Sequence, residues 1–194
     1  MKKENQFFLN IIKEYIKNEP STIQDGIDWN TIFGYSKAHQ LTAIVYHQCK
    51  SVIPEEYFPY FDMAAKATLY SNVKRKKLAE DTLTLLRKHG IKCFIVKGFE
   101  IAEYYPTPMY RTMGDTDIVV ENMDEADAIL GKNSFCAIAK RNNKEFQYIK
   151  DGMEFELHNR LSYKDVINTE SASNFLNSYE EYIINVCSLT EHLS

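Results

Sequence analysis

Two short acidic patterns in the second half of the chain carry residue types that bind divalent cations. The first is Asp115-Thr116-Asp117, which leads into the apolar run at positions 118–120. Side chains two residues apart on a strand point to the same face, so we expect Asp115 and Asp117 to lie side by side. Carboxylates this close repel each other and raise each other's pKa, and a bound Mg²⁺ or Mn²⁺ removes that cost.

The second acidic pattern consists of Glu154, Glu156 and His158, which alternate with apolar residues. In a strand, this alternation places the three polar side chains on the face opposite the core. If this strand lies beside the one that carries Asp117, the carboxylates converge on a site for two metal ions, as in phosphoryl displacement. Polar and apolar residues also alternate in any strand of a sheet with one solvent-exposed face, so the competing interpretation is that these carboxylates are merely solvated. No role is assigned to Glu154.

A glycine and two cations precede or flank the first acidic pattern. A short apolar strand ends at Lys97-Gly98, and a brief helix is expected to begin there. Gly98 lets the backbone approach a ligand closely, and a helix N-terminus attracts phosphate. Lys97 and Arg111 are placed to meet the same phosphates. Taken singly, Lys97 is also typical of a solvated strand end, and Arg111 of a surface ion pair.

The elements that must position these residues begin with a helical first half, where apolar residues recur at helical spacing. The predicted helices cover residues 4–18, a short segment capped by Asp28, a segment that carries His39, Leu41 and Ile44, and residues 61–88. Gly90 suits the left-handed position that closes the last helix. The basic run at 74–77 is read as a solvated helix face, with a local anion-binding patch as the alternative.

After Gly90 the pattern changes to short strands. These are predicted at 92–96, 117–120, 135–139, 145–149 and 153–157, with helices over 98–105 and 123–130 and a last helical segment over 179–193. Asn142-Asn143 and Asp151-Gly152 suit hairpin turns between the last three strands. The chain therefore predicts an α+β fold, with a helical N-terminal region over 1–90, a core over 91–160 and a C-terminal helical segment over 161–194, which is either truncated or the end of a short natural chain.

Composition and charge argue against several classes of protein. The chain has 194 residues, 44% of them hydrophobic, and a net charge of -4, which argues against broad, nonspecific nucleic-acid binding. No apolar run approaches the roughly 18–20 residues that span a bilayer, and the first residues lack the apolar region of a signal peptide. The four cysteines form no CxxC pair, so we expect reduced thiols and a cytoplasmic location, with no membrane partner.

The ordered set of motifs resembles the nucleotidyltransferase superfamily with the polymerase-β-like fold. More narrowly, it resembles a family of uncharacterised bacterial nucleotidyltransferases. The matching segments are Asp28-Trp29, His39, Lys97-Gly98, Tyr105-Pro106, Arg111, Asp115-Thr116-Asp117 and Glu156-Leu157-His158. The resemblance covers the chain roughly from Asp28 to the C-terminus.

The resemblance implies a polymerase-β-like core, a mixed sheet with flanking helices, behind the helical N-terminal region. It implies that Asp115 and Asp117 bind metal, that Glu156 is the third carboxylate, and that the Lys97-Gly98 turn holds a nucleoside triphosphate. The superfamily's usual Gly-Ser turn is replaced here, so phosphate binding is expected to depend on Lys97 and on backbone N–H groups. His158 would orient a carboxylate or contact the nucleotide, unless it is purely structural.

The first functional hypothesis is therefore a nucleotidyltransferase that depends on Mg²⁺ or Mn²⁺. It would move a nucleoside monophosphate from a nucleoside triphosphate, most simply ATP, to an acceptor hydroxyl on a small molecule, protein or RNA, and release pyrophosphate. The alternative is a non-catalytic nucleotide-binding or regulatory module with a protein partner, for example in a toxin–antitoxin or defence system. A third hypothesis is a helical interaction protein whose acidic strands are merely solvated.

Overall fold

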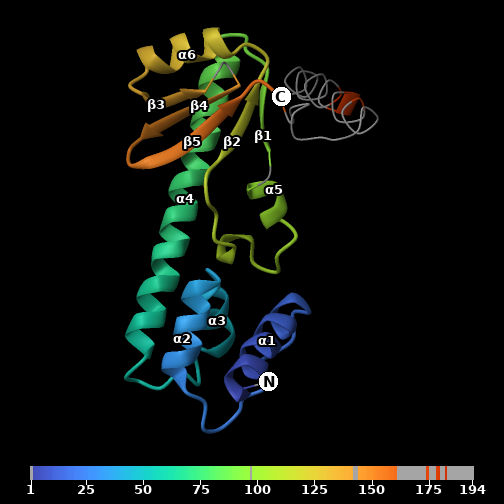
Figure 1. Cartoon of the computed structure of the whole chain (residues 1–194), viewed down its shortest axis with the longest axis vertical. Coiled ribbons are helices and arrows are strands. Elements are labelled where there is room, and N and C mark those ends of the chain that lie inside the picture. Colours follow the sequence, from blue (N-terminus) through green and yellow to red (C-terminus); the bar gives the residue numbers. More distant parts are fainter. Residues whose placement is uncertain are drawn as a thin grey trace. The chain divides into compact units, whose positions relative to one another are not determined.

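The computed structural model describes residues 2–96, 98–141 and 144–160, together with residues 174, 178, 179 and 182. Over these residues the chain combines a helical N-terminal region with a five-stranded mixed sheet (Figure 1). The predicted α+β class, with helices before the sheet, is confirmed. Most of the predicted helix over 179–193 and the predicted turn at Asn142-Asn143 lie outside the described residues.

The chain divides into two compact units. The first contains residues 1–74 and 100–113, and the second contains residues 75–99 and 114–194. The long helix α4 (Phe58–Lys88) contributes residues to both. Each unit has its own hydrophobic core, so each is described separately.

The first unit is built from α1 (Lys3–Ile16), α2 (Trp29–Ala38), α3 (Thr42–Cys49) and the beginning of α4. Its core is aromatic. The Trp29 ring meets Phe7 and Phe61 edge-on, with centroids 6.0 and 6.1 Å away. Ile11 and Ile32 are fully buried beside them. These residues come from three different helices, and this shared core therefore holds short helices that would be marginal in isolation.

The boundaries of α2 follow from local chemistry. Asp28 caps the helix as predicted, because its carboxylate accepts a hydrogen bond from the Asn30 N–H at 3.0 Å. The prediction that His39 and Leu41 lie inside a helix is wrong, since α2 ends at Ala38 and α3 begins at Thr42. Gln40 adopts a left-handed φ of +58° between the two helices, which no α-helix accommodates.

The segment 100–113 is fastened to the first unit by two polar side chains. The Tyr15 hydroxyl donates to the Thr107 carbonyl at 3.2 Å and accepts from the Thr107 N–H at 3.1 Å. The buried Asn72 amide donates to the carbonyls of Met109 and Arg111, both at 2.8 Å. This segment contains most of α5 (Phe99–Ala102) and the short 3-10 helix η1 (Pro108–Tyr110).

The second unit contains the sheet, whose strand order is β1-β2-β5-β4-β3. The strands are β1 (Cys93–Val96), β2 (Asp117–Val120), β3 (Cys136–Arg141), β4 (Glu145–Lys150) and β5 (Met153–His158). β2 and β5 are parallel, and every other neighbouring pair is antiparallel. β2 and β5 are therefore interior strands that lie side by side, although 32 residues separate the end of one from the start of the other in the sequence.

One face of the sheet is covered and the other carries the polar side chains. Ile118, Phe155 and Leu157 point into a core that also takes apolar residues from the end of α4 and from α6 (Met123–Lys132). Alternation along β5 sends Glu154, Glu156 and His158 to the opposite face, as predicted. β5 thus has a buried face and a partly exposed polar face, whereas all four residues of β2 are buried.

The hairpin between β4 and β5 has a two-residue turn. Asp151 and Gly152 adopt φ values of +51° and +76°, which is the left-handed geometry expected for a tight turn of this composition. The turn fixes the register, so that Gln147 lies opposite Glu156 and Glu145 opposite His158. This register brings four polar side chains, two from β4 and two from β5, to one patch of the sheet.

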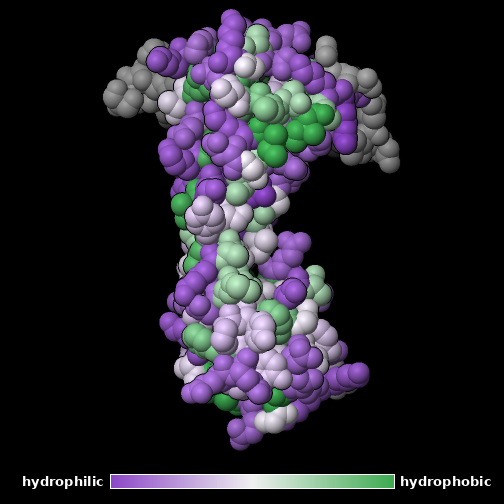
Figure 2. All heavy atoms as spheres, turned by 90° about the vertical axis from the view of Figure 1, so that its left-hand side faces the viewer, coloured by the Kyte–Doolittle hydropathy of each residue, from purple (hydrophilic) through white to green (hydrophobic). Residues whose placement is uncertain are grey.

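The described surface is mainly polar. In the face shown in Figure 2, hydrophilic side chains predominate and hydrophobic ones gather in small groups. Exposed apolar residues such as Ile138 and Tyr70 occur on both units, as is usual for globular proteins. Among the described residues, no helix is long and apolar enough to cross a bilayer.

Candidate functional site

The candidate site begins with the pairing of β2 and β5. Asp117 and Glu156 are direct partners in the parallel ladder, and the Glu156 N–H donates to the Thr116 carbonyl at 2.9 Å. The backbone therefore fixes two carboxylates on adjacent strands, both on the polar face. Asp117 is the first residue of its strand and its carboxylate is only 12% exposed. Burying a carboxylate is costly unless hydrogen bonds or a positive charge compensate it.

His158 completes a cluster of three. Its Nε2 atom lies 3.1 Å from Asp117 Oδ1 and 3.4 Å from Glu156 Oε2. One ligand atom from each of the three residues lies within 4.8 Å of the other two. Two carboxylate oxygens and one imidazole nitrogen are a donor set that suits divalent cations, because carboxylates suit Mg²⁺ and Mn²⁺ and imidazole is a common ligand of transition-metal ions. The residues present therefore fit a metal ion.

The charges of this cluster act on His158. Burial by itself would lower its pKa, but the hydrogen bond with Asp117 and the negative charges of Asp117, Glu156 and Glu145 outweigh burial and raise it above the usual value. The imidazole thus tends to hold a proton among the carboxylates. A divalent cation that binds these atoms takes over the same role of balancing negative charge.

Gln147 orients one of the carboxylates. Its Nε2 donates to Glu156 Oε1 at 2.6 Å and to Glu145 Oε1 at 3.2 Å. One oxygen of Glu156 is therefore held by β4, and the other, Oε2, is directed toward His158. The sequence interpretation missed Gln147. The sequence contains the signal that could have identified it. Counting residues back from the two-residue turn Asp151-Gly152 makes Gln147 the partner of Glu156.

The remaining acidic residues are placed differently. Asp115 lies before β2 rather than in it, and it is exposed. It does not belong to the cluster of three that the described residues form, so its part in metal binding stays a prediction. Glu154 is also exposed, and its backbone carbonyl accepts a hydrogen bond from Arg75 Nη1 at 3.3 Å.

The predicted phosphate-binding residues are described in part. Gly98 has a φ of +40°, a left-handed geometry that favours glycine, at the turn between β1 and α5. Lys97 lies outside the described residues. Arg111 belongs to the first unit, so its contact with phosphate stays a prediction. The helix predicted over 98–105 is shorter than expected, because α5 spans four residues, and phosphate binding at Gly98 would depend on backbone N–H groups rather than on a helix dipole.

Comparison with known families decides the classification. A family model described as an uncharacterised nucleotidyltransferase matches residues 25–189. The chain belongs to this nucleotidyltransferase family. No curated protein and no solved structure matches the chain. The match covers both acidic strands, and the observed α+β architecture is consistent with a nucleotidyltransferase core, as the resemblance implied.

Membership of a nucleotidyltransferase family gives the cluster a chemical context. Such a family implies nucleotidyl transfer from a nucleoside triphosphate, a reaction that generally uses divalent metals. The polar face of β2 and β5 supplies a group that could bind such a metal. The family and the donor set thus indicate the same chemistry.

Proposed function

We propose that this protein is a metal-dependent nucleotidyltransferase that uses Mg²⁺ or Mn²⁺. It transfers a nucleoside monophosphate from a nucleoside triphosphate, most simply ATP, to the hydroxyl of a small molecule, protein or RNA. The observation that carries the proposal is the convergence of Asp117, Glu156 and His158 in a member of a nucleotidyltransferase family. The substrate class fits a cytoplasmic enzyme.

In this proposal Asp117 and Glu156 hold the cation, with His158 in reach and Asp115 contributing from the exposed segment before β2. The cation, when bound, would neutralise part of the negative charge of the triphosphate. This would reduce the electrostatic repulsion between the triphosphate and the acceptor oxygen. Lys97, Arg111 and the backbone at Gly98 bind the phosphates.

The transfer forms one bond to phosphorus and breaks another. The acceptor oxygen bonds to the α-phosphorus, the bond between that phosphorus and the α–β bridging oxygen breaks, and pyrophosphate leaves with the electron pair. The acceptor proton passes to Glu156, whose Oε2 is the oxygen not held by Gln147. Gln147 therefore keeps the proton-accepting carboxylate in one orientation.

The test is incubation of the full chain with each α-labelled nucleoside triphosphate and either Mg²⁺ or Mn²⁺. Pyrophosphate release is scored, and label is sought in protein, RNA and small molecules. Asp117→Asn should abolish release. Asp151→Asn makes the same chemical change at an exposed turn residue with a left-handed φ, where Asn is well tolerated, and should leave release unchanged.

Retained release in Asp117→Asn would refute the assigned role of Asp117. Nucleotide binding without pyrophosphate release, under conditions in which the protein is folded, would favour the alternative of a non-catalytic nucleotide-binding or regulatory module. Absence of both metal and nucleotide binding would favour a helical interaction protein with solvated carboxylates.

A further inference from the structure

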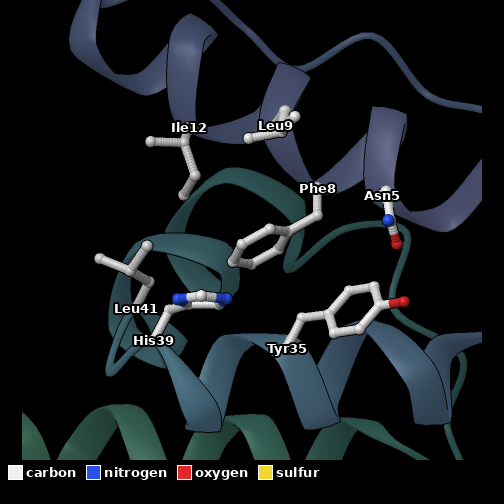
Figure 3. Close-up of a pocket in the computed structure, with 7 residues that line it drawn as sticks. All are labelled: Asn5, Phe8, Leu9, Ile12, Tyr35, His39 and Leu41. Atoms are coloured by element: carbon white, nitrogen blue, oxygen red, sulfur yellow. The ribbon is translucent and has the colours of Figure 1, made fainter. Parts of the chain in front are cut away.

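We propose that a pocket in the first unit binds a flat heteroaromatic ring that carries an N–H donor. The pocket, termed here the α1–α2 pocket, has a volume of about 380 Å³. Its lining includes Asn5, Phe8, Ile12, Tyr35, His39 and Leu41 (Figure 3). All of these residues belong to the first unit, so this inference does not rest on the proposed nucleotidyl transfer.

Three rings give the pocket its aromatic character. Phe8 comes from α1 and is 7% exposed. Its ring centroid lies 5.9 Å from that of Tyr35 at a steep angle and 5.8 Å from that of His39 at 31°. Figure 3 shows Phe8 on the side of α1 that faces α2, with Tyr35 on α2 and His39 directly after its end. Walls of this kind favour a planar aromatic guest, which gains both edge and face contacts.

Asn5 supplies the polar group. Its Oδ1 atom is buried and accepts no hydrogen bond from the residues that the structure describes. Buried acceptors are nearly always paired, because leaving one unpaired costs free energy. In Figure 3 the amide extends from α1 toward α2, in the direction of Tyr35. A small rotation of the amide would turn this oxygen into the pocket, where an N–H group of a bound ligand would satisfy it.

The size and balance of the lining indicate a small molecule. The volume falls within the range of about 300–1,000 Å³ typical of ligand sites, which are mainly apolar with a few polar groups that fix orientation. Leu9 also lines the pocket and is 43% exposed, so apolar surface remains in contact with water. A two-ring heterocycle would cover this surface and place its N–H against Asn5.

The experiment compares two probes of the same shape on the full chain. Indole carries a ring N–H, and benzofuran replaces it with an oxygen that cannot donate. Titration calorimetry should show saturable binding of indole at one site, with benzofuran at least tenfold weaker, because only indole pairs the buried oxygen. Chemical-shift changes should include the Phe8 and Tyr35 ring protons.

Two variants test the role of Asn5. Asn5→Leu removes the acceptor and should weaken indole about tenfold while leaving benzofuran unchanged. Asn30→Leu makes the same change at an exposed position of α2 and should alter neither probe. No saturable binding of indole, equal affinity for the two probes, or indole binding unaffected by Asn5→Leu would each overturn the proposal. If Asn5→Leu fails to fold, the comparison of the two probes on the native chain still decides.

Discussion

Replacing Gln147 with Met is the sharpest test of how the site is built. Methionine keeps the length of the side chain but removes the amide that donates to Glu156 Oε1 at 2.6 Å and to Glu145 Oε1 at 3.2 Å. Without this bridge, Glu156 is free to rotate and the two carboxylates repel each other across the β4–β5 pair. The strand pairing itself should survive, because the backbone ladder of β4 and β5 is unchanged.

The magnitude follows from the contacts that are lost. A hydrogen bond to a charged group contributes about 1.5–3 kcal/mol net. Only the 2.6 Å bond acts directly on Glu156, and its carboxylate is 18% exposed, so water restores little of the loss. Since about 1.4 kcal/mol is a factor of ten, Mn²⁺ affinity should fall roughly 10- to 100-fold, the range expected for residues that orient metal ligands.

The assay is Mn²⁺ binding followed by electron paramagnetic resonance on the full chain. Ile149→Met is the matched control, because Ile149 lies on the same face of β4 but pairs with Glu154 rather than with Glu156. In a Glu156→Gln background, Gln147→Met should add little further loss, since the carboxylate it orients is gone. An unchanged affinity in Gln147→Met, or full additivity of the two changes, would refute the idea that Gln147 acts through Glu156.

Three further predictions concern stability and reactivity. Leu157 is fully buried on β5, so Leu157→Ala should lower the free energy of unfolding by about 2–5 kcal/mol in urea titrations, and a loss below about 1 kcal/mol would contradict the assigned core. Burial raises the pKa of the Cys49 thiol to about 12, whereas Cys136 is exposed, so brief treatment with N-ethylmaleimide should label the Cys136 peptide and spare Cys49 on mass spectrometry. Burial, helped by Lys50, lowers the pKa of His47, so His47 binds fewer protons in the folded state than in the unfolded one and its contribution to stability should decrease as pH falls below the usual value of 6.5, whereas the raised pKa of His158 acts in the opposite direction. His47→Gln should flatten this dependence in urea midpoints measured between about pH 5 and 8, and an unaltered slope would exclude His47 as its source.

Much of the fold was predictable because local patterns and tertiary packing agree. The strand predicted at 117–120 is β2 itself, and the Asp28 cap and the Asp151-Gly152 turn are where the sequence indicates. The errors lie where the φ angle of a single residue determines where a helix ends. Gln40 at φ +58° separates α2 from α3, and nothing in the apolar spacing of that segment signals a left-handed residue.

The site was harder to predict than the fold, because strand order is not a local property. The acidic patterns identified Asp117, Glu156 and His158 as candidates, but only the order β1-β2-β5-β4-β3 makes their strands neighbours. The two-residue spacing of Asp115 and Asp117 suggested a shared strand face. β2 instead begins at Asp117, so one carboxylate is buried and the other exposed.

The arrangement is better explained by ligand binding than by folding. Asp117 and Glu156 are adjacent carboxylates that are largely withdrawn from water, on strands whose other face already forms a full hydrophobic core. Buried ion pairs contribute little net stability, and apolar residues of similar size would serve a sheet at least as well. A protonated His158 carries one positive charge beside these two carboxylates, whereas a divalent cation carries two. A fold under selection for stability alone has no reason to keep two carboxylates on paired interior strands, whereas a site that binds a divalent cation uses both.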